Sequence, residues 1–346
     1  MIARIPFVLL VLTASAIAAA FLLDVRFPIS ADEAIRRELR PVATTEELDG
    51  RILAALEKGD AEDAAMYAEI ADYLRRPLPE ETRMRLAEAM TTSATLARNA
   101  VGFASGFVSG DGATTAEFAG SVASDLTVIG DVRDIASEGG KMVVGDDYSQ
   151  LIFGLSVVGL AASGVSVATG GGGLPAKLGV STLKVAARAG TLTAEFAAIL
   201  LRLTRDAVNL QGLGLTLRGI RLTDLRATED ALLEYARGVR QADIFPVVAK
   251  LGDLGDVVGP GETVRLLRYV RTTDDLDDIA AMGTRLGKKT RGVVELTGKT
   301  SLRAFRMSLN VFEFLAQWII ALAAWIASIL GLSVLQRIMR RRRRSA

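Results

Sequence analysis

The sequence contains neither cysteine nor histidine among its 346 residues. Their absence excludes disulfides, thiolate nucleophiles, zinc sites of the Cys/His type and the Ser-His-Asp triad. Carboxylate chemistry, a Ser-Lys pair or phosphate binding by backbone amides would remain possible. No strong motif points to any of them, so we expect a protein that is not an enzyme and that holds no metal or cofactor.

Excess charge of one sign is also missing, because the formal net charge is only +1. This balance hides an uneven distribution, since seven arginines lie at the two ends of the chain: Arg4, Arg337, Arg340, Arg341, Arg342, Arg343 and Arg344. Without these seven, the 41 basic residues fall to 34 against 40 carboxylates, so the body carries about −6. An acidic body is a poor partner for nucleic acid.

Two terminal segments have no charged side chain, namely Ile5 to Leu23 and Phe314 to Leu335. Each is close to the roughly 20 residues that a transmembrane helix needs. The first segment is either an uncleaved anchor or an export signal, because the small residues at 14–16 and 18–20 suit a signal peptidase. Both alternatives export the body of the protein.

The flanking arginines predict the topology, because basic residues stay on the cytoplasmic side of a membrane. Arg4 and the C-terminal arginines are therefore expected in the cytoplasm of a bacterium, with the body in the periplasm and the lipid bilayer as a partner. Trp318 and Trp325 suit interfacial anchoring or helix packing. A helical pattern that starts near Ser301 continues into the second span.

The chain between the spans is typical of an all-α protein. Cap-like residues such as Ser30 and Thr45 precede Ala-, Glu- and Arg-rich segments, and prolines at 77 and 79 interrupt them. We expect a helical body with N- and C-terminal transmembrane helices. The expected segments are an anchor or signal sequence (1–24), a helical segment (25–100), a Gly/Ala-rich apolar segment (101–191), a helical bundle segment (192–300), a long helix that includes the C-terminal span (301–337) and a cytoplasmic Arg-rich tail (338–346).

The apolar segment begins with Gly102, Gly106 and Gly110 at four-residue spacing. Such a glycine zipper puts small residues on one helical face and lets a second backbone approach closely. It is common in membrane helices, and the alternative is a tightly packed soluble helix pair. The partners expected for such a small-residue face are a second copy of the chain or another envelope protein.

A short motif follows, with Asp125, Gly130, Asp131 and Asp134 around an apolar stretch. It resembles the motif of the pre-toxin regions of bacterial polymorphic toxins, and with about fifty following residues it covers under a fifth of the chain. The sequence lacks a delivery region and a recognisable toxin domain, so the resemblance implies at most a membrane-associated module. The whole chain is similar to two-span bacterial inner-membrane proteins of unknown function. For the aspartates we expect a turn with helix caps rather than a metal site.

No charged side chain occurs from Tyr148 to Ala176. We expect buried core helices here. The alternative is a membrane hairpin with arms at 151–168 and 192–203 and a cytoplasmic loop that carries Lys177, Lys184 and Arg188. Glu195 and Arg202 within the second arm argue against it.

Three further patterns are expected to be structural. The glycines at 171 and 173 with Ala176 resemble a dinucleotide loop, but no repeated strand and helix units surround them. The stretch from Gly292 to Thr300 differs from a phosphate loop by one residue in its glycine spacing. A cluster of four aspartates between 274 and 278 is typical of a helix start rather than a calcium site.

The function expected from these features is that of a non-enzymatic, membrane-anchored envelope protein that serves as a scaffold or interaction module. The alternative is a membrane-perturbing or pore-forming, toxin-like protein that inserts its Gly-rich central segment.

Overall fold

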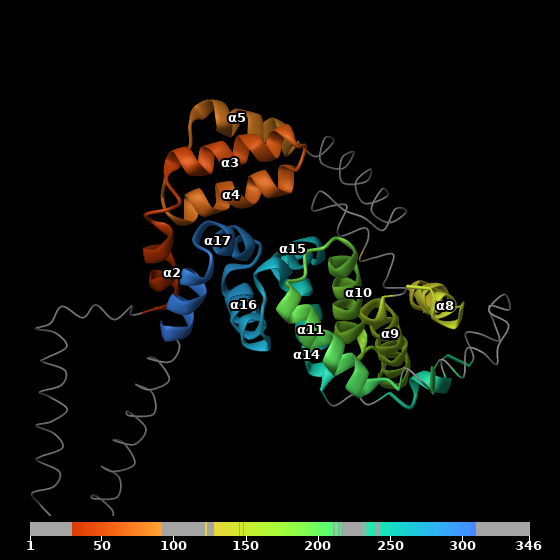
Figure 1. Ribbon diagram of the computed structural model, residues 1–346. Coiled ribbons are helices and arrows are strands. Elements are labelled where there is room, and N and C mark those ends of the chain that lie inside the picture. The colour runs from red at the N-terminus through yellow and green to blue at the C-terminus, as the bar shows by residue number, and fades with distance from the viewer. Residues whose placement is uncertain are drawn as a thin grey trace, which may run out of the picture. The chain divides into compact units, whose positions relative to one another are not determined.

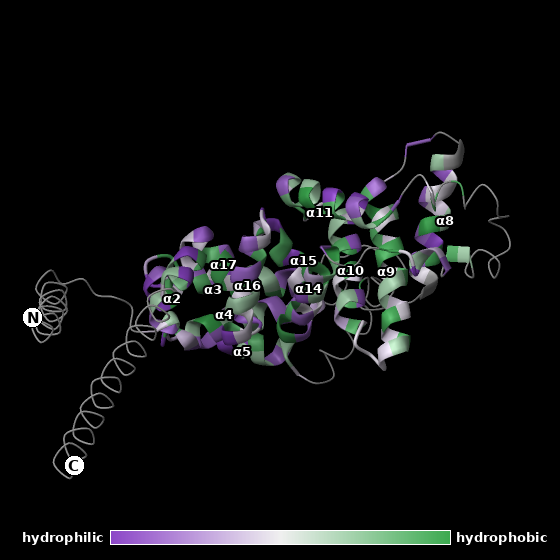
Figure 2. Cartoon of the chain, turned by 90° about the horizontal axis from the view of Figure 1, so that it is seen from below, coloured by the Kyte–Doolittle hydropathy of each residue, from purple (hydrophilic) through white to green (hydrophobic). Residues whose placement is uncertain are grey.

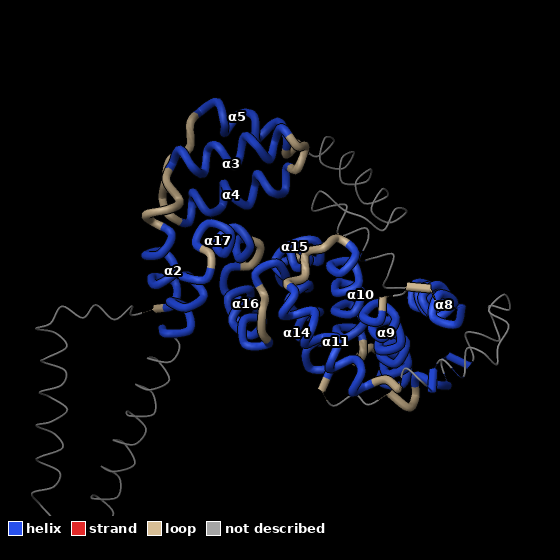
Figure 3. Tube along the Cα trace, in the orientation of Figure 1, coloured by secondary structure: helices blue, strands red, loops and turns tan. Residues whose placement is uncertain are grey.

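The computed structural model describes residues 30–91, 122, 128–144, 146–147, 149–209, 212–213, 215, 231–232, 234–239 and 243–308. Within these residues every regular element is a helix and there is no strand (Figure 3). The all-α expectation is confirmed for this part of the chain. The chain divides into two compact units, one comprising Met1–Arg37 with Arg303–Ala346 and the other comprising Glu38–Leu302.

Several residues singled out in the sequence lie outside the described residues. These are Arg4, Gly102, Gly106, Gly110, Asp125, Trp318, Trp325, Arg337, Arg340, Arg341, Arg342, Arg343 and Arg344. Both terminal spans also lie outside them. In the first unit the structure describes the start of α2 (Ala31–Leu39) and helical residues up to 308.

The second unit is a series of helices in which each packs against the next (Figure 1). Its N-terminal helices are α3 (Thr45–Glu57), α4 (Ala61–Tyr73) and α5 (Glu80–Ala89). The middle of the chain supplies α8 (Val128–Val144), α9 (Gln150–Thr169), α10 (Leu174–Arg188) and α11 (Ala194–Ala207). The last part supplies α14 (Ile244–Val258), α15 (Pro260–Leu266), the 3-10 turn η1 (Leu267–Tyr269), α16 (Thr273–Leu286) and α17 (Lys289–Thr297). The packing runs in the order α8, α9, α10, α14, α16, α17, α4, α3 and α5, so the N-terminal helices contact the end of the unit's chain.

Side-chain caps determine where many of these helices begin. The hydroxyl of Thr44, not the expected Thr45, accepts a hydrogen bond from the Glu47 N–H at 3.2 Å and starts α3. Asp60, Ser149 and Thr193 cap α4, α9 and α11 in the same way. Each cap satisfies an amide that the first helical turn leaves without a partner.

The expectation that residues 148–176 form core helices agrees with the first half of α9, whose residues 153–162 are buried, but not with residues 167–170, which are exposed. Among the described residues, α9 alone is long and apolar enough to cross a membrane, with a mean hydropathy of 2.1, but 56% of that window is buried in the protein. The residues assigned to a loop in the hairpin alternative instead form α10, which packs between α9 and α14. That part of the alternative is wrong, because α10 has its own buried face.

The turn between α9 and α10 contains the glycines of the dinucleotide-like pattern. A helix and not a strand precedes them, and Gly170 ends α9 in the left-handed conformation with φ of 65°. Pro175 lies in the first turn of α10, where its missing N–H is not needed. The glycines therefore connect two helices, which agrees with the structural role expected for this pattern.

The contact between α10 and α14 depends on two glycines. A Cβ atom on Gly179 would lie 1.8 Å from the carbonyl oxygen of Val248, and one on Gly252 would lie 1.9 Å from that of Pro175. Both distances are far inside van der Waals contact, so the two backbones touch at these positions.

We predict that Gly179→Ala lowers the free energy of unfolding by about 1–3 kcal/mol, because the added methyl forces α10 and α14 apart. Gly50→Ala in α3 is the control, since a Cβ there meets nothing within 4 Å. It should raise stability by about 0.5–1 kcal/mol, because alanine favours a helix interior. Urea denaturation of both variants measures whether each substitution lowers or raises the free energy of unfolding. Equal changes in the two variants would contradict the close approach of α10 and α14.

Candidate functional site

Asp131 and Asp134 lie on α8, so the turn expected around them is wrong. Asp131 is in the first turn of the helix and is completely buried. Gly159 of α9 makes the space for its carboxylate, because a Cβ there would lie 2.6 Å from Oδ2 of Asp131. The motif therefore places a charged group between two helices.

Three basic side chains of α10 meet these carboxylates. Lys184 Nζ lies 2.8 Å from Asp131 Oδ1 and 2.7 Å from Asp134 Oδ2. Lys177 donates a hydrogen bond to Asp131, and Arg188 Nη2 lies 2.6 Å from Asp134 Oδ2. We call Asp131, Asp134, Lys177, Lys184 and Arg188 the α8–α10 cluster.

Burial and ion pairing have opposite effects on the carboxylates of the α8–α10 cluster, in which the side chains of Asp131 and Lys184 are 0% exposed. Burial raises the pKa of Asp131, although Lys184 and Lys177 act in the opposite direction. Burial would also raise the pKa of Asp134, but Lys184 and then Arg188 outweigh it and hold this pKa below its usual value. Carboxylates and cations paired in this way bind helices to one another.

A second buried cluster lies around Arg291 of α17, whose side chain is 5% exposed. Its guanidinium contacts Asp63 of α4 and Glu262 of α15, and Nη1 lies 2.6 Å from Glu295. Glu295 also accepts a hydrogen bond from Arg51 of α3 at 2.9 Å. The cluster therefore joins four helices.

Tyr67 of α4 lies between the two arginines of this second cluster. Its ring centroid is 5.5 Å from Cζ of Arg51 and 5.9 Å from Cζ of Arg291, and its hydroxyl accepts from Arg51 at 3.2 Å. These distances suit cation–π attraction. Burial, with Glu295 nearby, raises the pKa of Tyr67, so the phenol stays neutral at physiological pH. We call Arg51, Asp63, Tyr67, Glu262, Arg291 and Glu295 the Arg291 cluster.

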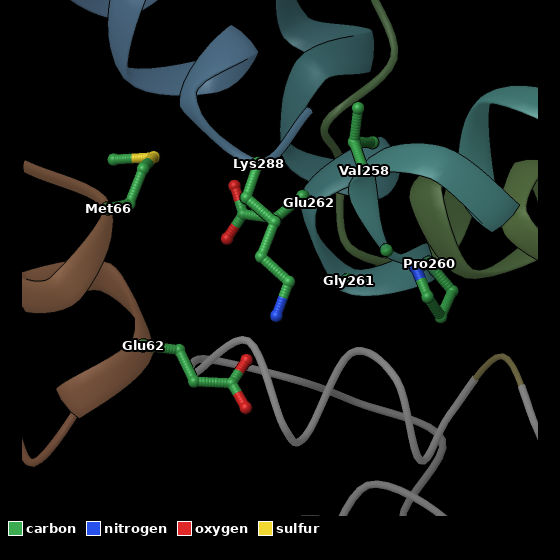
Figure 4. A pocket seen from close by; sticks show the side chains of 8 residues that line it. Glu62, Met66, Val258, Pro260, Gly261, Glu262 and Lys288 are labelled. Carbon is green, nitrogen blue, oxygen red and sulfur yellow. The ribbon is translucent and has the colours of Figure 1, made fainter. Parts of the chain in front are cut away.

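A small cavity adjoins the Arg291 cluster, with a volume of about 170 Å³. Figure 4 shows Glu62 of α4 and Lys288, the residue before α17, extending toward it from different elements. Met66, Val258, Pro260 and Glu262 also line it. Its volume is below the roughly 300 Å³ at which pockets for drug-sized ligands begin.

The phosphate-loop-like stretch comprises the second part of α17, the turn at Gly298 with φ of 60° and the first residues of the helical segment that follows. Gly292 lies within α17, where its missing side chain makes room for Ile70 and Met66 of α4. Lys299 forms an ion pair with Asp275 at 2.7 Å. The geometry therefore agrees with the expectation of a chance match.

The aspartates near 275 start α16, as expected. Thr272 and Asp275 form a capping box in which each side chain binds the other's backbone N–H. Asp277 pairs with Lys250 on α14. Throughout the described residues, no group of three or more acidic side chains is placed to hold a metal ion.

Comparisons with protein-family models, with curated proteins and with solved structures found no match to this chain. The pre-toxin resemblance thus stays a prediction that rests on its own four residues. Three of them, Gly130, Asp131 and Asp134, lie on α8.

Sequence reasoning did not find either cluster. The signal for the first was present, because Lys177, Lys184 and Arg188 share one helical face within an otherwise apolar region. For the second, the partners of Arg291 are spread from Asp63 to Glu295, and no local pattern connects them.

We predict that Lys184→Met lowers the free energy of unfolding by about 3–5 kcal/mol, because it leaves two buried carboxylates short of a cation. The control Lys250→Met removes an ion pair whose side chains are 40% and 53% exposed. That loss should stay within about 1 kcal/mol. Guanidinium denaturation measures both, and a similar loss in the two variants would contradict a structural role for the α8–α10 cluster.

The stability of the folded protein should depend on pH through the side chain of Asp275. Burial acts to raise its pKa, but Lys299 and the N–H groups of Arg271 and Thr272 lower it below the ordinary value. A lowered pKa means that the folded state binds the proton less well than the unfolded chain. The stabilisation is present above about pH 4, the unfolded value, and is lost as pH falls through the folded pKa.

Asp275→Asn should therefore lose less stability than the wild type between about pH 5 and pH 2. Thermal unfolding at a series of pH values measures this difference. The variant Asp253→Asn, at an exposed position of α14, controls for the loss of a negative charge. Identical slopes for the wild type and Asp275→Asn would contradict the prediction.

Proposed function

We propose that the chain is a membrane-anchored, non-enzymatic scaffold or interaction module of the bacterial cell envelope. In this proposal residues 5–23 and 314–335 are held in the inner membrane, the acidic helical body lies in the periplasm and the Arg-rich tail lies in the cytoplasm. The uncharged terminal segments and the arginines beside them support this arrangement.

The observation that carries a structural role is the use of the buried charges. In the α8–α10 cluster and the Arg291 cluster, carboxylates and cations from different helices neutralise one another. Carboxylates and cations that pair with one another in this way hold the helices of the body together. They are not available for proton transfer or nucleophilic attack. Partner binding would use other surfaces, such as the small-residue face predicted for Gly102, Gly106 and Gly110.

The alternative, a pore-forming protein, has one observation in its favour, namely the length and hydropathy of α9. Insertion of α9 would first have to separate it from α8, α10 and α11. Moving α10 with it would break the ion pairs of Lys177 and Lys184 with Asp131. The large cost of unpaired buried charges favours the scaffold.

The absence of cysteine makes the topology directly testable. We predict that a membrane-impermeant maleimide labels Met84→Cys and Arg237→Cys in intact cells, because both residues are exposed and belong to the proposed periplasmic body. Ser345→Cys should react only after the cells are permeabilised. Labelling of the first two positions only after permeabilisation would contradict the proposal.

Ala189→Cys, at an exposed position of the segment that the hairpin alternative places in the cytoplasm, distinguishes the two functions in the same assay. Labelling from outside supports the scaffold, and protection until permeabilisation supports an inserted central segment. For a pore, the purified protein should also release dye from vesicles, and Gly106→Leu should reduce that release.

A further inference from the structure

The turn between α9 and α10 exposes apolar side chains. We call residues 163–175 the α9–α10 tip. Val167 is 87% exposed and Leu174 is 56% exposed, whereas residues 153–162 of the same helix are buried by α8, α10 and α11. Green and pale colours dominate α9 in Figure 2. The helix thus has a core half and an apolar half that projects from the core.

The α9–α10 tip also lacks charge. No charged residue occurs between Asp147 and Lys177, and Lys177 is itself buried against Asp131. Protein surfaces that face water normally intersperse charged side chains with apolar ones. An exposed turn without them suits a surrounding medium in which charge is costly.

Some polar groups of the α9–α10 tip are hydrogen-bonded within it, whereas the buried hydroxyl of Ser166 has no such bond. The hydroxyl of Ser163 donates to the carbonyl of Gly159 at 3.0 Å, and that of Thr169 donates to Val165 at 2.7 Å. The N–H groups of Gly171 and Leu174 donate to Ser166 and Gly171 at 2.8 and 2.9 Å. Each internal bond lowers the cost of bringing the turn into contact with lipid, where no water replaces it, and the remaining polar groups limit that contact to a shallow depth.

We propose that the α9–α10 tip inserts into the apolar layer of a lipid bilayer, with Val167 and Leu174 as the side chains that contact lipid. The core half of α9 stays packed in the protein, so the contact is shallow and differs from the insertion of a whole hairpin. It adds to the proposed terminal anchors and does not depend on them. The absence of charge at the tip makes the contact independent of anionic headgroups.

Spin labelling tests this contact on the full chain reconstituted in vesicles, since the protein has no cysteine of its own. Val167→Cys and Leu174→Cys each carry a nitroxide at the α9–α10 tip. Met84→Cys in α5 and Met90→Cys at the end of α5 are matched controls, because both are exposed apolar residues, at 60% and 41%, on a helix that packs against α3 and α4. Collision rates with oxygen, which enters lipid, and with a water-soluble nickel chelate locate each label.

The labels at 167 and 174 are expected to collide often with oxygen and seldom with the chelate, and the labels at 84 and 90 should show the reverse. The result should be the same in phosphatidylcholine vesicles and in phosphatidylethanolamine vesicles with phosphatidylglycerol. Access of the chelate to position 167 equal to that at 84 would overturn the proposal. An immobilised label that neither reagent reaches would also overturn it, because a protein surface would then cover the tip.

Extraction of the same vesicles at high pH separates this proposal from the anchoring one. Protein released by the extraction would contradict the terminal spans, while the collision data taken before extraction still decide the α9–α10 tip. Protein that resists extraction but carries a water-exposed label at position 167 would support the terminal anchors and contradict the lipid contact of the α9–α10 tip.

Discussion

A charge inside a protein must be paired, and this constraint connects the helices of the second unit. Asp131 has no exposed surface, so α8 is stable only where Lys177 and Lys184 of α10 reach it. In the same way, the buried charge of Arg291 on α17 requires that α4 and α15 pack against this helix, because they supply its partners Asp63 and Glu262. Because each pair joins residues far apart in sequence, the clusters specify which helices become neighbours, in addition to the apolar contacts that drive the packing.

Close backbone contact works together with these pairs. Gly179 and Gly252 bring α10 against α14, and Gly159 leaves room beside α9 for the carboxylate of Asp131. α10 is thus held on one side by a backbone contact and on the other by ion pairs. With α10 and the first half of α9 held in the core, their connecting turn projects with its apolar side chains exposed, which is the arrangement on which the lipid contact rests.

Local sequence predicted much of the fold. The cap expected at Ser30 agrees with the start of α2 at Ala31, and the prolines expected to interrupt the helices lie between α4 and α5, since such signals act within a few residues of each other. The cap expected at Thr45 is one residue away from the observed cap Thr44, because the two neighbouring threonines have the same capping chemistry. The turn expected at Asp131 was wrong for a different reason. An aspartate in an apolar stretch looks like a cap until its lysine partners are known.

By itself the sequence determined the helical class, the exclusion of cysteine and histidine chemistry, the charge-free terminal segments and the charge-free stretch from Tyr148 to Ala176. These properties depend on composition or on residues a few positions apart. Only the tertiary structure decided that Lys177 and Lys184 are buried partners of Asp131, and that this stretch is half core and half exposed turn. The physical reason is that burial and ion pairing depend on distances in space. Asp131 and Lys184 become neighbours only when α8 and α10 pack around α9.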